Sequence, residues 1–308
     1  MVRSMNRAEG RIGTSPLRAL ARLVLGSAVA GIGLAALSSC AESAFYYPSR
    51  EPFETPEGYR DVEFKTSDGV MLRGWFIPAR VQASSVPGAS SGAGHSAPAV
   101  LHVHGNAGNI AGHAAFSDFL ADAGISVLVF DYRGYGRSEP ARNLSRELLY
   151  RDTQAALEYL QSRPDVDSGR IGVYGVSLGG AFALNLAADR PEIRAVCTVS
   201  SFSTWQGAAS DHAPVLGSML IRSGLDPANA AARLGDRPYL IIHGARDSMI
   251  APIHADRLEA AARAAGVRVE KYIVPEGDHN DAVFVEHRVR PLIAAFFAQN
   301  LERAEPDR

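Results

Sequence analysis

A serine between two glycines is the residue best suited to chemistry in this sequence. The segment GVSLG at 175–179 follows an apolar run, 170–174, and opens an alanine-rich helical pattern, 177–188. A serine on a sharp turn between a strand and a helix exposes its hydroxyl, and flanking glycines leave room for that turn. The pattern predicts Ser177 as a nucleophile and the backbone N–H of Leu178 as an oxyanion donor. The alternative is a tight turn carrying an inert serine.

Serine is a weak nucleophile and needs a base, which in turn needs an orienting acid. His279 follows the apolar run 269–274, and Asp247 follows the run 239–243. Parallel sheets gather their sites at the carboxyl ends of their strands. We therefore expect His279 to act as the base and Asp247 to orient it. The alternatives for the acid are Asp278, Asp281 and Asp226. Among the other histidines, we expect a structural role for His243 and solvated positions for His254 and His287.

A glycine-containing loop, HGNAGN at 104–109, follows the apolar run 99–103 and could supply a second oxyanion donor. We assign this to the N–H of Asn106; the alternative is an ordinary turn. His102 and His104 would share one face of a strand, as in some zinc sites, but no further ligand cluster accompanies them. The sequence predicts no metal and no cofactor. The GIG at 31–33 has no strand before it and is rejected as a dinucleotide motif.

Short apolar runs alternate with helical patterns from residue 99 onward, which predicts a parallel sheet with helices on both faces. The fold class is α/β with about eight strands, because an antiparallel pair around the turn SDG at 67–69 precedes the alternation. The expected strands are 61–66, 71–77, 99–103, 126–130, 170–174, 195–199, 239–243 and 269–274. The expected helices are 111–123, 144–161, 177–188, 254–265 and 282–300.

The expected organisation is one large domain at 61–300 behind an N-terminal tether at 40–60. The segment 80–98 is rich in Ser, Gly, Ala and Pro and is predicted to be a flexible surface insertion. The segment 202–238 interrupts the strand rhythm and is predicted to be a small helical cap. Residues 301–308 form a tail.

The composition is that of an ordinary globular protein: 46% of the 308 residues are hydrophobic and 21% are charged. Net charge is −2, and no basic patch lies outside the leader, so we expect no nucleic-acid partner. Of the two cysteines, Cys197 lies in an expected buried strand. The cysteines form no disulfide framework.

The first 39 residues are predicted to be an export signal. Five arginines precede the apolar run 23–37, whose 15 residues span about 22 Å as a helix, short of the ~30 Å bilayer core. The segment LSSC at 37–40 resembles the lipobox of bacterial lipoproteins, which implies acylation of Cys40 and a membrane anchor in the cell envelope. In a cell with an outer membrane, we expect the anchor to lie in that membrane. Alternatives are an uncleaved N-terminal helix and ordinary secretion.

Taken together, the motifs at 104–109, 131–138, 175–180, 243–247 and 277–281 resemble the alpha/beta-hydrolase superfamily. The segments 45–48, 66–69 and 74–76 resemble its small-cap branch, related to serine aminopeptidase-like hydrolases and depalmitoylating thioesterases. The order Ser177, Asp247, His279 is the order of that superfamily. One departure is Ser248-Met249-Ile250, where an acidic residue and a valine are more usual, but it leaves Asp247 in place.

We therefore expect a serine hydrolase that cleaves carboxylic esters or thioesters through an acyl-enzyme. The membrane address and the apolar residues of the cap favour substrates with acyl chains such as palmitate. The alternatives are a serine peptidase on the same fold and a non-catalytic, membrane-anchored binding module. The fold alone does not decide between these functions, because one fold hosts many of them. The residues of the site must decide.

Overall fold

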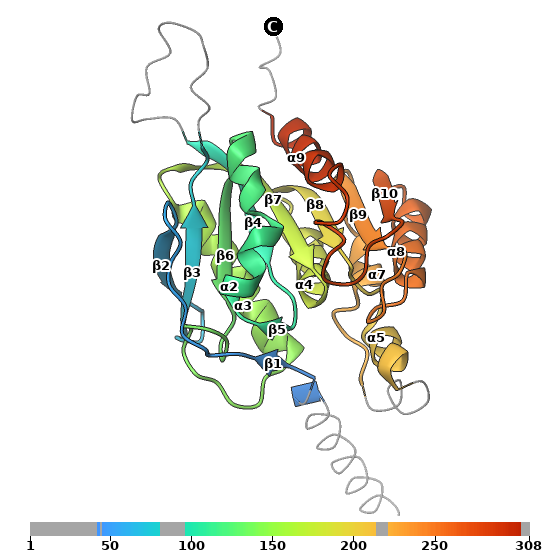
Figure 1. Ribbon diagram of the computed structural model, residues 1–308, viewed down its shortest axis with the longest axis horizontal. Helices are drawn as coiled ribbons and strands as arrows, with labels where there is room; N and C mark the ends of the chain where they lie inside the picture. Colours follow the sequence, from blue (N-terminus) through green and yellow to red (C-terminus); the bar gives the residue numbers. More distant parts are fainter. Residues whose placement is uncertain (1–41, 44, 81–95, 214–220, 303–308) are drawn as a thin grey trace, which may run out of the picture.

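The computed structural model describes residues 42–43, 45–80, 96–213 and 221–302. The predicted signal at 1–39, Cys40 and most of the predicted insertion and tail lie outside these residues. The described main sheet has eight strands in the order β10-β9-β8-β7-β4-β6-β3-β2 (Figure 1). Only β2–β3 and β3–β6 are antiparallel pairs. The predicted α/β fold and its antiparallel start are therefore confirmed.

The strands and helices of the described residues alternate along the chain as follows. The main-sheet strands are β2 (Arg60–Lys65), β3 (Met71–Ile77), β4 (Ala97–Val103), β6 (Ser126–Asp131), β7 (Val166–Val176), β8 (Ile193–Val199), β9 (Tyr239–Gly244) and β10 (Val269–Val274). The helices are α2 (Ile110–His113), α3 (Arg146–Ser162), α4 (Leu178–Asp189), α5 (Trp205–His212), α7 (Pro227–Ala231), α8 (Ile253–Ala264) and α9 (Val289–Asn300), with the 3-10 helices η1 (Ala114–Phe116) and η2 (Asp118–Ala123).

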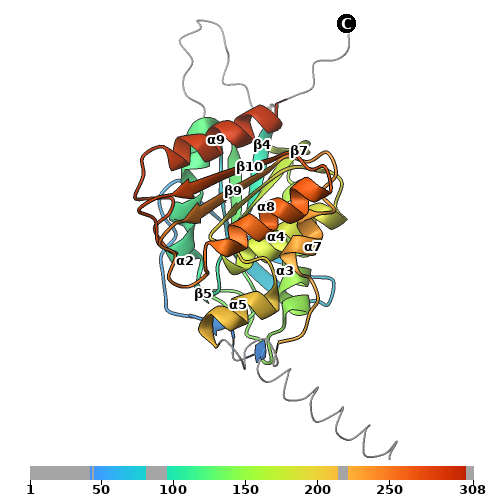
Figure 2. The same ribbon diagram turned by 90° about the vertical axis from the view of Figure 1, so that its right-hand side faces the viewer.

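Helices cover both faces of the sheet, so the central strands are apolar on both sides (Figure 2). Helices α3, α4 and α8 lie on one face and α9 on the other. Successive strand residues point to opposite faces. Leu101 and Leu128 accordingly belong to the core under the first group, and their neighbours Val100 and Val127 belong to the core under α9.

The expected helix at 111–123 is wrong: the structure has the single turn α2 followed by η1 and η2. Ser117 breaks the segment, with φ −139° and ψ −11°. Its hydroxyl is hydrogen bonded to the ring of His102 on the adjacent strand, at 2.7 Å, in a fully buried position. This side-chain bond competes with a continuous helix.

The expected helix at 282–300 begins late, because α9 starts at Val289. Pro291 then falls in the first turn, where its missing N–H costs nothing, whereas a start at 282 would place it in the helix interior. Residues before Val289 form turns instead, with the carboxylate of Asp281 accepting from the N–H of Asp278 at 2.6 Å.

A small second sheet joins the N-terminal segment to the loop after β4. Strand β1 (Tyr47–Pro48) pairs in parallel with β5 (Ala107–Gly108), and the N–H of Ser49 donates to the carbonyl of Gly108 at 2.8 Å. Both strands lie beyond the carboxyl ends of the parallel strands, on the same side of the molecule as α5 (Figure 1). Helix α5 is the first helix of the predicted cap segment. Residues 214–220 of that segment lie outside the described residues.

A buried ionic cluster holds the loop after β6 against α3. Asp152 is fully buried and accepts from the backbone N–H and the Nε of Arg133, both at 2.8 Å. Asp68 pairs with the same guanidinium at 2.8 Å. Asp131, also buried, accepts from the N–H of Ile110 and of Arg137, and so ties this loop to the one after β4.

We predict that Asp152→Ala lowers the free energy of unfolding by about 3 kcal/mol, because it removes the buried acceptor of the Arg133 backbone N–H and guanidinium and leaves that guanidinium paired with Asp68 alone. Urea unfolding followed by circular dichroism measures the change. The matched control is Arg80→Ala, which breaks the solvent-exposed pair with Asp122 and is expected to cost at most about 1 kcal/mol. Equal losses of unfolding free energy in the two variants would contradict the conclusion that the buried ion pair stabilises the fold more than the exposed one.

Candidate active site

Ser177 occupies a strained turn between β7 and α4. Its φ of 52° and ψ of −116° lie outside the helical and extended regions. A Cβ at Gly175 would come within 2.5 Å of the carbonyl oxygen of Gly179, and one at Gly179 would overlap the carbonyl oxygen of Val103. Both glycines are therefore required by close backbone approach, and the strain holds the hydroxyl above the sheet edge.

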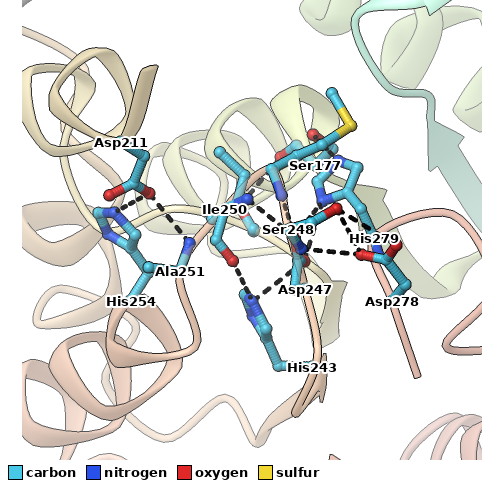
Figure 3. Close-up of polar contacts among 12 residues, drawn as sticks. Ser177, Asp211, His243, Asp247, Ser248, Ile250, Ala251, His254, Asp278 and His279 are labelled. Atoms are coloured by element: carbon cyan, nitrogen blue, oxygen red, sulfur yellow. Dashed lines mark hydrogen bonds and ion pairs between the residues drawn. The ribbon is translucent and has the colours of Figure 1, made fainter. Parts of the chain in front are cut away.

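His279 lies in the loop between β10 and α9 and points its ring at the serine (Figure 3). Its Nε2 is 3.0 Å from Oγ of Ser177. Its Nδ1 lies 2.9 and 3.0 Å from the two carboxylate oxygens of Asp247. With Nδ1 protonated toward the carboxylate, Nε2 is free to accept the hydroxyl proton.

Asp247 follows β9 and is the most heavily hydrogen-bonded carboxylate at this edge. Beyond the ring of His279, its Oδ1 accepts from the N–H groups of Met249 and Ile250 at 3.0 and 2.8 Å. Nε2 of His243 lies 3.0 Å from the carbonyl oxygen of Ile250 and 3.2 Å from Oδ2 of Asp247, and neither the His243 nor the Asp247 side chain is exposed. Burial alone would raise the pKa of Asp247, but the donations from His243 and His279 outweigh it and hold that pKa well below its usual range. The carboxylate is thus charged at neutral pH.

The other carboxylates weighed for this role serve different partners. Asp278 accepts from the backbone N–H and hydroxyl of Ser248, and Asp281 accepts from the N–H of Asp278. Asp226 lies before α7 and accepts from the N–H groups of Trp205 and Gly224. None of these contacts involves the ring of His279.

The two expected oxyanion donors come from different elements near Ser177. Leu178 opens α4 directly after Ser177, and Asn106 lies in the loop after β4. Neither backbone N–H finds an acceptor among the described residues, so both are available to a bound oxygen. Tyr135 fixes the loop by donating its hydroxyl to the carbonyl of Asn106 at 2.7 Å.

The N-terminal segment also contributes residues to the site. The sequence predicted only a tether at 40–60 and did not indicate this contribution. The side-chain amide of Asn106 donates to the carbonyl of Phe45 at 2.6 Å. Phe45 and Tyr47 line the pocket beside Ser177. The aromatic cluster at 45–47, unusual for a tether, was the available signal.

One histidine takes a position that the sequence did not indicate, and a second makes a contact that it did not indicate. His254 was expected to be solvated, and this is wrong: it is fully buried at the start of α8. Its Nδ1 accepts from the N–H of Ser203 at 3.0 Å, and its Nε2 lies 3.1 Å from the carboxylate of Asp211 on α5 (Figure 3). His243, expected to be only structural, contacts the carboxylate of Asp247.

His102 and His104, the pair weighed as metal ligands, are both fully buried in or next to β4. Nδ1 of His102 bonds to Ser117, and Nδ1 of His104 to the carbonyl of Gly105, at 2.7 and 2.8 Å. Across the described ranges, no three His, Cys, Asp or Glu side chains group as a metal site requires.

A pocket of about 670 Å³ opens above Ser177 and His279. Its described walls come from the N-terminal segment, the loop after β4, the cap and the loop after β9, and they carry no Asp, Glu, Lys or Arg. Such a volume suits a substrate of modest size. A mostly apolar wall that lacks these charged side chains favours an uncharged, apolar substrate group.

Known sequences place this arrangement in a family. Residues 98–220 match the family model for the alpha/beta hydrolase fold. A Mycobacterium tuberculosis protein, Rv2307c, is 36% identical to this chain over a region that covers 79% of this chain and 82% of the length of Rv2307c. Uncharacterized protein YfhR of Escherichia coli is 33% identical over 83% of this chain and 88% of its own. The chain belongs to the alpha/beta hydrolase superfamily.

Solved structures with this fold include enzymes of two kinds. An esterase of Pyrococcus furiosus, Pf2001, superposes with a TM-score of 0.68 at 20% identity, covering 84% of this hydrolase-family chain and 99% of the esterase. An acylaminoacyl peptidase of Pyrococcus horikoshii gives a TM-score of 0.62 at 20% identity, covering 81% of this chain and 43% of the peptidase. At these identities the likeness concerns the fold.

We predict that His243→Leu slows labelling of Ser177 by a serine-directed fluorophosphonate roughly 10- to 100-fold. The variant removes an N–H that lies between the carbonyl of Ile250 and the carboxylate of Asp247, and a hydrogen bond to a charged group contributes about 1.5–3 kcal/mol. His243→Gln, whose amide can donate to the same oxygen, is expected to recover part of the rate. The measurement is the second-order labelling constant, with circular dichroism as the folding control. An unchanged constant in His243→Leu would show that the contact does not position Asp247.

Proposed function

We propose that this protein is a serine hydrolase that cleaves carboxylic ester or thioester bonds through an acyl-enzyme. The observation that carries the proposal is the continuous chain of contacts from Oγ of Ser177 through His279 to Asp247, with distances of 3.0 and 2.9 Å, at the floor of an apolar pocket. Nucleophile, base and orienting acid are thus in hydrogen-bonding reach before any substrate binds.

In the first half-reaction, Oγ of Ser177 attacks the substrate carbonyl carbon while its proton passes to Nε2 of His279. The carbonyl oxygen becomes an oxyanion, which the N–H groups of Leu178 and Asn106 can stabilise. When the tetrahedral intermediate collapses, His279 gives the proton to the leaving alkoxide or thiolate. The acyl group remains on Ser177, and an alcohol or thiol departs.

In the second half-reaction, water attacks the acyl-enzyme carbonyl and loses a proton to His279. Collapse of this intermediate releases the carboxylic acid and returns the proton to Ser177. Asp247 stays ionised throughout, because its hydrogen bonds lower its pKa, and it stabilises the imidazolium that forms in each half.

The pocket favours an acyl ester over a peptide. A peptidase that reads a free N-terminal amine needs an acidic group near the scissile bond, and the described pocket walls carry none. Phe45, Phe116, Ile221 and Met249 contribute apolar surface instead. We therefore propose an acyl chain as the group that the pocket holds.

We predict that the purified protein hydrolyses p-nitrophenyl esters of medium-chain acids and the matched thioester. It should cleave the matched p-nitroanilide at least about 100-fold more slowly. Ser177→Ala is expected to lower kcat by about three orders of magnitude or more, because the triad acts as a unit. Release of p-nitrophenol or thiol, followed by absorbance, measures these rates.

The matched control is Ser203→Ala, which alters a second buried serine bonded to a histidine and should keep ester hydrolysis. Equal cleavage of ester and anilide would favour the peptidase. No hydrolysis of any substrate by a folded parent protein would favour the non-catalytic module.

We also propose that residues 1–39 are an export signal and that acylated Cys40 anchors the protein to a membrane of the cell envelope. The support is the basic, apolar and small-residue order of the leader, ending in LSSC. Within the described residues, no helix is long and apolar enough to cross a membrane. More than one acyl chain on a single residue gives stable anchoring, where one chain does not.

We predict that mass spectrometry of the protein extracted from bacterial membranes finds residue 40 as an acylated N-terminus. Cys40→Ala is the control and should remain unprocessed, with the leader intact. Recovery of the parent protein with residues 1–39 still attached would favour the uncleaved helix instead.

A further inference from the structure

The exposed large apolar side chains of the described residues come from three segments that also supply or contact the pocket wall. There are five of them, each between 42% and 63% exposed, and together they form the apolar rim: Tyr47, Met249, Ile253, Phe284 and Val285. Exposed apolar groups scattered singly over a surface need no explanation, but a group of them at one site does.

Two members of the apolar rim line the pocket above Ser177, a third packs against its wall, and the other two lie near these in the chain. Tyr47 and Met249 form part of the pocket wall. The ring of Phe284 packs edge-on against Phe116, another wall residue, with 4.8 Å between centroids. Ile253 begins α8 just after the loop that carries Asp247, at the same edge of the sheet. The rim thus draws on the segments after β9 and β10 and on the N-terminal segment.

The chain from the N-terminal leader joins the molecule at this same edge. Glu42 forms an ion pair with the buried guanidinium of Arg146, at 3.0 Å, and that guanidinium lies over the ring of Trp205 on α5. Cys40 precedes Glu42 by only two residues, a separation of at most about 7 Å. The point at which the leader joins the described chain therefore lies at the edge of the sheet that carries the pocket.

Resting on the proposed function, we infer that the apolar rim lies against the surface of a phospholipid bilayer, so that the pocket takes its acyl substrate directly from the membrane. The N-terminal segment points to a lipid partner, because the described chain begins at Glu42, two residues after Cys40, at the same edge as the rim.

This orientation gives an acyl ester a continuous apolar path. A chain that leaves the bilayer beneath the rim enters a pocket without charged side chains and reaches Ser177 without crossing water. The apolar surface of the rim is then removed from water as well, which favours the bound orientation.

The first test compares two substrates for the full chain bound to phosphatidylcholine–phosphatidylglycerol vesicles: a water-soluble butyrate ester and a long-chain fluorogenic ester dissolved in the bilayer. The variant is Ile253→Asp/Val285→Asp, since neither residue lines the pocket. We expect its rate on the soluble ester to stay within 2-fold of the parent and its rate on the bilayer ester to fall at least 10-fold. Ser162→Asp, an exposed site at the far end of α3, is the control and should change neither rate.

Unchanged rates on both substrates, or equal losses on both, would overturn the inference. The first would mean that the rim does not meet lipid, and the second that these side chains act on the pocket itself. A parent protein that hydrolyses neither ester would contradict the proposed function and leave the orientation to the second test.

The second test needs no catalysis. A fluorophore placed at Val285→Cys or at Ser162→Cys of the vesicle-bound full chain, in a Ser177→Ala background, is exposed to lipids brominated along their acyl chains. We expect strong quenching at 285 and none at 162. Equal quenching at the two sites, or protection of 285 by a second copy of the chain seen as a dimer in light scattering, would contradict the inference.

Discussion

The backbone turn at Ser177 is the constraint on which the rest of the site depends. A positive φ at a residue with a side chain is unfavourable and persists only where neighbouring structure fixes it. Here the N–H of Ser177 donates to the carbonyl of Val199 on β8, and its own carbonyl accepts from the hydroxyl of Ser201. The close approach of Gly179 to β4 completes the turn. The sheet and α4 must therefore pack in one way for the nucleophile to be presented at all.

A second requirement is electrostatic, because the acid of the site is buried. An isolated buried carboxylate is very unfavourable, and only pairing and hydrogen bonds offset that cost. Asp247 meets the requirement through two histidine rings and two backbone N–H groups, all supplied by β9, its following loop and the loop after β10. The loop thus acquires its shape from the same bonds that keep the carboxylate ionised and aimed at His279.

Much of the fold could be predicted because most strands of the main sheet contain a short apolar run, and β3 and β10 begin and end where the sequence indicated. Strand β7 is longer than the expected run 170–174, since it begins at Val166. Two predicted helices had wrong bounds because a single residue outweighs the hydrophobic periodicity in each. In the first, Ser117 is hydrogen bonded to His102, and in the second, Pro291 fits only the first turn of a helix. The sequence also indicated Ser177, Asp247 and His279, since each follows a strand, and the structure brings them together. The contact of Asn106 with Phe45 could not be predicted, because it joins segments 61 residues apart that share no local pattern.

The central claim is that Ser177 carries the acyl group during turnover. The most direct measurement is to mix the protein with an activated ester, quench in acid within the first turnover, digest it and locate the added acyl mass by tandem mass spectrometry. The account predicts the acyl group on the peptide containing residue 177 and on Ser177 within it. An acyl group on any other residue, or none on a protein that is turning over ester, would contradict it.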